Sequence, residues 1–164
     1  MTAADTPMTA EDIGRRVIKL IDSLHSAKDL APDHIERQTG IKVEFNESDR
    51  TKYGFGGPVT DEWFYNLVSL PEKPGQTPTS LLFSFDDQTH NNADTAPICS
   101  FDFADYSSAL KAAGFDFKPM HGSRGVDAWY FSRGDIGVLA YTHGNQDPEE
   151  GQACVSKLII SAYA

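Results

Sequence analysis

Long hydrophobic runs and catalytic motifs are both missing from this chain of 164 residues. No run of about 18 apolar residues occurs, so no membrane-spanning helix is expected. There is no G-x-S-x-G nucleophile elbow and no G-x-x-x-x-G-K-S/T phosphate loop. Zinc-binding spacings such as H-E-x-x-H are also missing from the histidines, which are His25, His34, His90, His121 and His143. We therefore expect a protein that is not an enzyme and that holds no metal or cofactor.

Cysteine occurs only at Cys99 and Cys154, and each begins a run of alternating apolar residues that is typical of a strand. If the two strands are neighbours, the thiols could form a disulfide in an oxidising compartment. Otherwise they are buried as small apolar side chains. A catalytic thiol is not expected, because such thiols usually lie at a helix N-terminus or in an electropositive pocket.

Basic residues are scarce, with 14 Lys and Arg against 24 Asp and Glu and a formal net charge of −10. A nucleic acid or an anionic membrane would be repelled by such a field. A basic protein partner would be attracted, although acidic charge also serves solubility alone.

The length fits one domain. We expect residues 1–8 to form a flexible N-terminal tail and residues 9–164 a single α+β domain. The small, polar start of the chain is typical of a mature secreted protein that has lost a signal peptide, which would place it in the periplasm. A frayed N-terminus of a cytoplasmic protein is the alternative.

The apolar pattern predicts two N-terminal helices packed on a largely antiparallel sheet of about seven strands, with one inserted helix. Thr9 is the expected N-cap of the first helix, which should end near His25, and Gly40 should end the second. Period-two alternation predicts strands that include residues 41–45, 81–85, 99–103 and 129–131. Helical spacing over residues 106–113 predicts the inserted helix, and residues 133–135 fit a hairpin turn between two later strands.

Three segments between the predicted core elements are the expected contact surface, because loops usually carry function. Residues 53–58 are rich in glycine and aromatics, which fits a β-turn, a bulge or a binding loop. Residues 86–94 form a polar loop that could hold Ca²⁺ but lacks EF-hand spacing, so Asx turns are the alternative. The third segment is residues 143–150, within the acidic loop at 143–152. The candidate partner-binding residues are Tyr53, Phe55, Asp86, Asp87, His90, Asp94, Glu149 and Glu150.

Six segments together carry a resemblance to a known group of proteins. They are residues 13–21, 39–43, 53–57, 63–67, 83–89 and 154–158. Their layout, over most of residues 10–162, resembles small immunity proteins of xanthomonad bacteria, which accompany toxins of a bacteria-killing type IV secretion system. The resemblance implies a protein that binds a cognate effector and blocks it stoichiometrically, without catalysis.

Two other functions fit the sequence. The chain could inhibit a lysozyme or another peptidoglycan hydrolase in the periplasm by inserting an acidic loop into a basic cleft. It could instead be a small hydrolase or ligand-binding domain, which would need convergent polar groups in a deep pocket. A homo-oligomer is compatible with every one of these functions.

Overall fold

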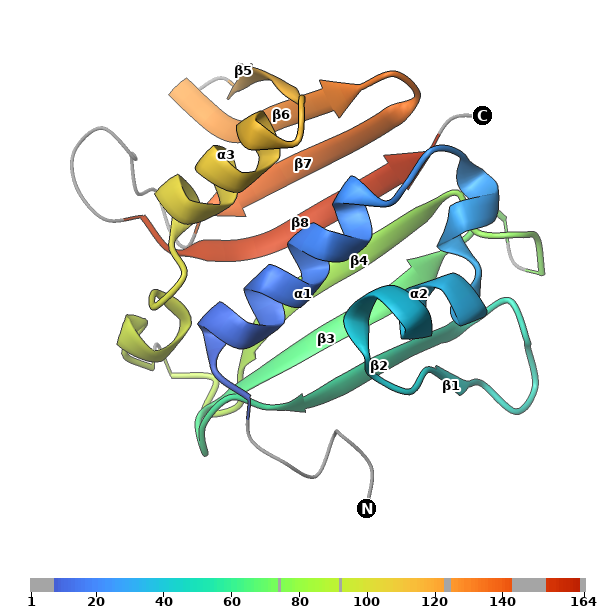
Figure 1. Ribbon diagram of the computed structural model, residues 1–164. Coiled ribbons are helices and arrows are strands. Elements are labelled where there is room, and N and C mark those ends of the chain that lie inside the picture. The colour runs from blue at the N-terminus through green and yellow to red at the C-terminus, as the bar shows by residue number, and fades with distance from the viewer. Residues whose placement is uncertain (1–7, 74, 92, 123–124, 143–152, 163–164) are drawn as a thin grey trace.

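The computed structural model describes residues 8–73, 75–91, 93–122, 125–142 and 153–162, without the side chains of 120–127. Figure 1 shows the helices and strands in chain order. The helices are α1 (Ala10–Asp22), η2 (Ala27–Leu30), α2 (Pro32–Thr39), η3 (Ala96–Ile98) and α3 (Phe103–Ala112). The strands are β1 (Glu44–Phe45), β2 (Tyr53–Pro58), β3 (Trp63–Leu70), β4 (Ser80–Asp87), β5 (Asp116–Gly122), β6 (Gly125–Arg133), β7 (Ile136–Thr142) and β8 (Val155–Ala162).

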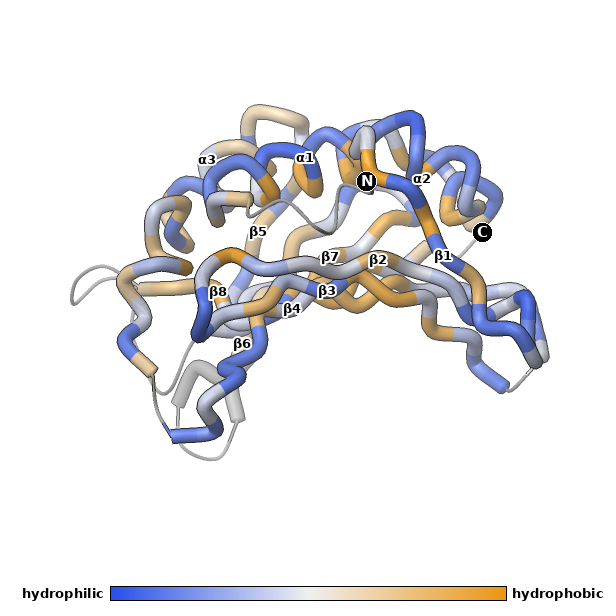
Figure 2. Tube along the Cα trace, turned by 90° about the horizontal axis from the view of Figure 1, so that it is seen from below, coloured by the Kyte–Doolittle hydropathy of each residue, from blue (hydrophilic) through white to orange (hydrophobic). Residues whose placement is uncertain are grey.

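The strands form one sheet in the order β1-β2-β3-β4-β8-β7-β6-β5, and all neighbouring pairs are antiparallel. The last strand, β8, therefore lies in the middle, between β4 and β7. Figure 2 shows α1, α2 and α3 on one side of the sheet and none of the described helices on the other. The α+β prediction is confirmed, with eight strands among the described residues where about seven were expected.

Helix α1 forms where the sequence predicts it. Thr9 Oγ1 accepts a hydrogen bond from the backbone N–H of Asp12 at 3.0 Å. The helix ends at Asp22, three residues before the expected end, and the chain then turns into η2. Helix α2 ends as predicted, because Gly40 has φ 72° and closes it in the left-handed conformation.

The core fills the space between the helices and the sheet. Helix α1 contributes residues that recur along one face, and α3 contributes the fully buried Tyr106. Gly14 lets these two helices approach, since a Cβ there would lie 2.5 Å from Phe101 Cδ2 and 2.9 Å from the Tyr106 hydroxyl oxygen. The largest fully buried side chains of the sheet are Trp63, Tyr65, Phe83 and Phe131.

The prediction of a strand over residues 41–45 is wrong for its first three residues. Ile41 and Val43 are buried, as the alternation implies. However, the Ile41 N–H donates to Thr39 Oγ1 at 3.2 Å, and the Val43 N–H donates to Glu36 Oε1 at 2.8 Å. Side chains of α2 thus take the backbone donors that a strand would need, and only Glu44 and Phe45 pair with β2.

The prediction of a strand over residues 99–103 is also wrong. Cys99, Phe101 and Phe103 are buried in alternation, but Cys99 closes η3 and Phe103 begins α3. Asp102 caps α3 by accepting from the Asp105 N–H at 3.0 Å, and Asp105 accepts from the Asp102 N–H in return. This capping box starts the helix three residues earlier than the helical spacing indicates.

Cys99 and Cys154 form a disulfide, with their Cα atoms 4.9 Å apart. It joins the end of η3 to the residue before β8. Beside it, the Phe103 N–H donates to the Ala153 carbonyl oxygen at 2.9 Å. The segment between β4 and α3 is therefore fixed to the start of the central strand β8.

The first described residue belongs to the packed part of the chain. Met8 is 9% exposed, and its N–H donates to the Pro58 carbonyl oxygen at 3.0 Å. The predicted tail includes Met8, which the structure places against β2, whereas residues 1–7 lie outside the described residues. No helix in the described part of the chain combines the length and apolar character that crossing a membrane requires.

Candidate binding surface

The side of the sheet opposite the helices carries a continuous apolar row. Strand register places its members directly opposite one another across five adjacent strands. In order from β3 to β6, they are Val68, Leu82, Ile159, Leu139 and Tyr130. We call these residues the open-face row. Val68 is 39% exposed and the other four are half-buried, so the row forms an accessible apolar strip.

Polar side chains border the open-face row on both sides. Ser84 and Lys157 pair two positions away on one side, and Ser80 and Ser161 do so on the other. The two serine hydroxyl oxygens are 2.9 Å apart and share a hydrogen bond. An apolar centre with a polar rim is the usual anatomy of a protein–protein contact.

A shallow hollow of about 530 Å³ lies at the β3 end of the open-face row. Gly54 and Gly56 of β2 contribute only backbone to it, while Val68 and Leu70 of β3 carry side chains that are 39% and 36% exposed. Glu44 of β1 lies on its other side. This depression could accept a side chain from a partner, but it lacks the enclosure of a small-molecule pocket.

Glycine at 54 is required by the approach of β2 to β3. A Cβ at Gly54 would overlap the carbonyl oxygen of Leu67, and one at Gly56 would lie 2.5 Å from Asn66 Oδ1 and 3.0 Å from the Tyr65 carbonyl oxygen. The glycine-rich segment is thus a strand in close contact with its neighbour. The expectation that residues 53–58 form a turn or a binding loop is wrong.

Tyr53 and Phe55 point into the core, where each is 7% exposed. The Tyr53 hydroxyl donates to the Leu30 carbonyl oxygen at 2.6 Å, and burial raises the pKa of Tyr53 to about 12. Phe55 packs edge-on against Tyr65, with their ring centroids 6.2 Å apart. These side chains hold η2 and the helices on the sheet, so the strand offers a partner its backbone and the half-buried Pro58.

The polar loop after β4 is built around Asp87. Its Oδ1 accepts from the Thr89 N–H at 2.8 Å and from the Thr89 hydroxyl at 2.6 Å, and its Oδ2 accepts from the Ala93 N–H at 2.9 Å. These hydrogen bonds, the Thr89 hydroxyl first, lower the pKa of Asp87 to about 2. Asp87 therefore shapes the loop, as the Asx-turn alternative predicts.

The other predicted residues of this loop have different surroundings. Asp86 is exposed on the open side of the sheet and accepts a short hydrogen bond from the Asn66 amide. His90 is exposed with φ 56°, a left-handed turn conformation, and the Asp94 side chain is also exposed. No group of three His, Cys, Asp or Glu in the described residues could hold a metal ion. Glu149 and Glu150 lie outside the described residues.

An acidic edge lies at the end of the sheet where β3 begins and β4 ends. We define it as Asp61, Glu62, Asp86 and Asp94. The Gln88 N–H donates to the Glu62 carbonyl oxygen at 2.7 Å, and Trp63 Nε1 donates to the Asp94 carbonyl oxygen at 2.8 Å, which brings the two segments together. Neither segment contains Lys or Arg, and Lys73 lies in the turn at the opposite end of β3 and β4.

Connecting segments project from both ends of the sheet on the open side. Figure 2 shows the loop that follows β4 and the turn between β3 and β4 extending past the sheet on the side away from the helices. The open-face row lies between these two projections, because its residues occupy the middle of β3 and β4. The hollow, the row and the acidic edge thus belong to one surface.

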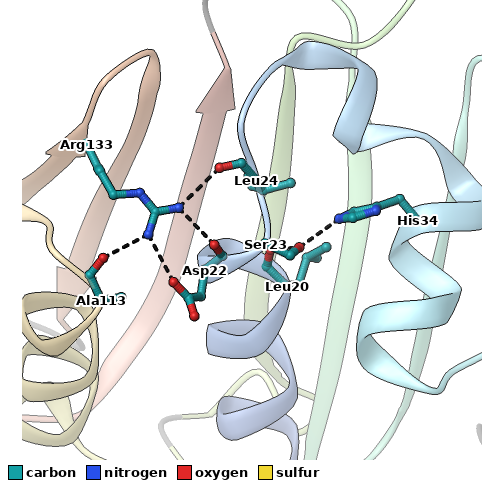
Figure 3. A network of polar contacts seen from close by, with 7 residues as sticks. All are labelled: Leu20, Asp22, Ser23, Leu24, His34, Ala113 and Arg133. Atoms are coloured by element: carbon teal, nitrogen blue, oxygen red, sulfur yellow. Dashed lines mark hydrogen bonds and ion pairs between the residues drawn. The ribbon is translucent and has the colours of Figure 1, made fainter.

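A polar network on the helical side, centred on Arg133, is structural. The Arg133 guanidinium donates to the Asp22 and Leu24 carbonyl oxygens at 2.9 and 3.1 Å, to the Ala113 carbonyl oxygen at 2.8 Å and to the Asp22 carboxylate at 3.0 Å (Figure 3). It thereby neutralises backbone acceptors at the C-terminal ends of both α1 and α3.

Ser23 and His34 form the contact closest to hydrolase chemistry. The Ser23 hydroxyl oxygen lies 2.7 Å from His34 Nε2 and 2.5 Å from the Leu20 carbonyl oxygen, to which it donates (Figure 3). The other ring nitrogen, Nδ1, faces the Arg37 guanidinium at 3.5 Å. In a Ser–His–Asp triad, a carboxylate occupies that position and orients the base. This contact closes the last turn of α1 onto α2.

Sequence reasoning did not select the open-face row. In each strand, alternate residues face the core and the residues between them face the open side. The members of the row belong to the second set, so in the sequence each looks like an isolated apolar residue at the surface. Only the strand order and the register bring them into one line. The same alternation, applied to both faces of each predicted strand, could have suggested them as a set.

Comparisons with known proteins give no relative. No family model, curated protein or solved structure matches this chain.

Proposed function

We propose that this chain is an immunity protein that binds a cognate antibacterial effector and blocks it stoichiometrically. The open-face row carries the proposal, because five apolar side chains in register on a sheet face that no described helix covers fit a protein contact better than a reaction centre. The resemblance to xanthomonad immunity proteins supports the same function.

The charge of the chain supports a protein partner of opposite sign. A net charge of −10 raises the encounter rate with a basic effector and disfavours nucleic acid. Surface contact of this kind needs no cofactor and no catalytic group on the immunity protein, because it acts by covering the effector.

The disulfide supports a periplasmic location. Disulfides persist in oxidising compartments such as the periplasm and are rare in the bacterial cytosol. The Cys99–Cys154 bond closes a loop with a sequence separation of 55, and it fixes the segment before α3 to β8. We therefore infer that the protein meets its effector after export.

Co-expression tests the proposal. The product of the gene adjacent to this one is expressed in the periplasm of a susceptible bacterium, with or without this chain directed to the same compartment. The expected result is growth arrest without the chain and normal growth with it. Equal growth arrest in both cases would contradict the proposal.

A separate enzyme assay tests the competing inhibitor function. Inhibition of a purified basic lysozyme by this chain, measured as slower clearing of a cell-wall suspension, would favour a peptidoglycan-hydrolase inhibitor instead. We expect no change in the clearing rate.

A further inference from the structure

We propose that the open face of the sheet is the docking surface, and that its partner is a basic protein whose contact area has an apolar centre and Lys or Arg side chains at one end. This inference rests on the proposed function and adds to it the surface and the chemistry of the partner. The open-face row meets the apolar centre, and the acidic edge meets the basic end.

The apolar part of the surface has the size and continuity that a protein contact needs. The row crosses five strands and, at about 4.8 Å between neighbouring strands, spans about 19 Å. The hollow beside Val68 and Leu70 extends it toward β1. Hydroxyls of Ser80, Ser84 and Ser161 border the row and can exchange water for hydrogen bonds to a partner.

The charge of β3 and β4 is polarised along these two strands, and the exposed Lys157 of β8, which pairs with Ser84 on the same face, has its ammonium group 4.6 Å from the Tyr141 ring centroid. Asp61, Glu62 and Asp86 lie where β3 begins and β4 ends, whereas Lys73 lies near the other end of the same strands. Between Lys73 and Lys111 the sequence contains no Lys or Arg. A partner with Lys or Arg at the matching end would gain attraction there, which fixes its orientation on the sheet.

The same charge argues against a second copy of this chain as the occupant. Each copy carries a formal net charge of −10, so two copies repel each other as they approach. A basic protein gains from the same field. Charge complementarity therefore selects a basic partner of different sequence.

Binding measurements on matched variants test this surface. The probe is the purified product of the adjacent gene, and affinity and association rate are measured by surface plasmon resonance at several salt concentrations. Val68→Lys introduces a charge into the open-face row at a side chain that is 39% exposed. Its control is Phe117→Lys, which changes a side chain that is 38% exposed on β5 and packs against Phe131 of the core.

Val68→Lys should weaken affinity by about tenfold or more, as for a contact near an interface centre, and Phe117→Lys should change it by about twofold or less. Glu62→Lys should slow association and flatten its salt dependence. Asp135→Lys, which makes the same charge change in the β6–β7 turn, should have a smaller effect on the association rate. Circular dichroism and urea unfolding identify any variant that has lost its fold.

The outcomes are distinguishable. Wild-type binding that both Val68→Lys and Glu62→Lys leave unchanged would overturn the surface while keeping the proposed function. No binding by the wild-type chain would contradict the proposed function and the surface together. A wild-type dimer in light scattering that Val68→Lys converts to a monomer would overturn the basic partner in favour of a second copy.

Discussion

Arg133 is the side chain that connects the most elements in the described structure. It lies on β6, and its guanidinium reaches carbonyl oxygens at the ends of α1 and α3 while stacking over the Phe115 ring at 4.6 Å. The sequence gives no warning of this role, because an Arg in a predicted hairpin turn is usually solvated. Only the packing of both helix ends over β6 makes it a structural residue.

Replacing Arg133 with Ala should lower the free energy of unfolding by about 2–3 kcal/mol, because several charge-assisted hydrogen bonds are lost and carbonyl acceptors lose their partner. Urea unfolding followed by circular dichroism measures the change. Arg15→Ala is the matched control, since that side chain is 66% exposed, pairs with Glu11 on the same helix and lies 5.2 Å from the centroid of the Phe101 ring. Its expected cost is about 1 kcal/mol or less. Equal losses in the two variants would contradict the role assigned to Arg133.

The lowered pKa of Asp87 predicts how the stability of the protein depends on pH. Its pKa is about 2 in the folded protein, below the ordinary aspartate value of 3.8, so its ionised form stabilises the loop above pH 4. This contribution should decline as pH falls from about 4 to about 2. Asp87→Asn should therefore be less stable than wild type at pH 7, with the difference shrinking as pH falls through that window. A difference that stays constant down to about pH 2 would show that the carboxylate charge is not involved.

Tyr53 and Phe55 show the limit of residue-type reasoning. Aromatics beside glycines suggest an interface loop, but the same composition occurs where glycines let a strand approach its neighbour and the aromatics fill the core. The alternating burial along β2 shows that the second arrangement is present, with Tyr53 and Phe55 in the core. Asp86, a candidate partner-binding residue, is exposed at the end of a strand whose apolar alternation is strong.

At the scale of elements, we predict that the two glycines of β2 differ in how much an alanine substitution destabilises the protein. Gly54→Ala places a methyl group against the Leu67 carbonyl, which is backbone and cannot move without shifting β3. Gly56→Ala meets the Asn66 side chain, which can rotate, as well as the Tyr65 carbonyl oxygen at 3.0 Å. We expect Gly54→Ala to cost about 2 kcal/mol of unfolding free energy and Gly56→Ala less. The reverse order in thermal or urea unfolding would contradict the close approach at Gly54.

The disulfide joins two elements that are distant in the chain. Removing it with Cys99→Ser and Cys154→Ser should lower the free energy of unfolding by about 4 kcal/mol in the chain-entropy account of a loop of this length. Urea unfolding of wild type with and without reductant, beside the double variant, measures the effect. In reductant, wild type and the variant should unfold at similar urea concentrations. A variant as stable as the oxidised protein would contradict the prediction.

Residues with a specific backbone role predicted the ends of helices and strands correctly. The strand predictions were wrong where side chains hydrogen-bond to the backbone N–H groups. Thr9, Gly40 and the Arg133–Asp135 turn gave correct boundaries because each uses a backbone feature that is specific to its place. Residues 41–45 and 99–103 alternate in burial without forming full strands. In both segments, side-chain oxygens of Thr39, Glu36 or Asp105 bind backbone N–H groups that a ladder would use.

At the scale of the whole molecule, strand order is the feature that sequence could not supply. β8 is added last in the chain but lies between β4 and β7, which joins two halves of the sheet through long-range pairing. This insertion places Ile159 between Leu82 and Leu139 and so completes the open-face row. Helix positions were predictable from periodicity, whereas a surface made by register across five strands was not.

The layering of the molecule separates its two faces by role. Helices α1, α2 and α3 cover one side of the sheet, and the Arg133 network ties the C-terminal ends of α1 and α3 to β6. The other side carries the apolar row, the hollow and the acidic edge. A binding protein of this design keeps its fold on one side and presents a preformed surface on the other, which limits the ordering cost of association.

Methyl NMR of the wild-type protein, titrated with the product of the adjacent gene, tests the central claim most directly. The account predicts that the methyl signals of Val68, Leu82, Leu139 and Ile159 shift or broaden, while that of Ile18, which lies in the groove between α1 and α3, stays in place. Shifts at Ile18 with unchanged signals from the four open-face methyl residues would contradict it.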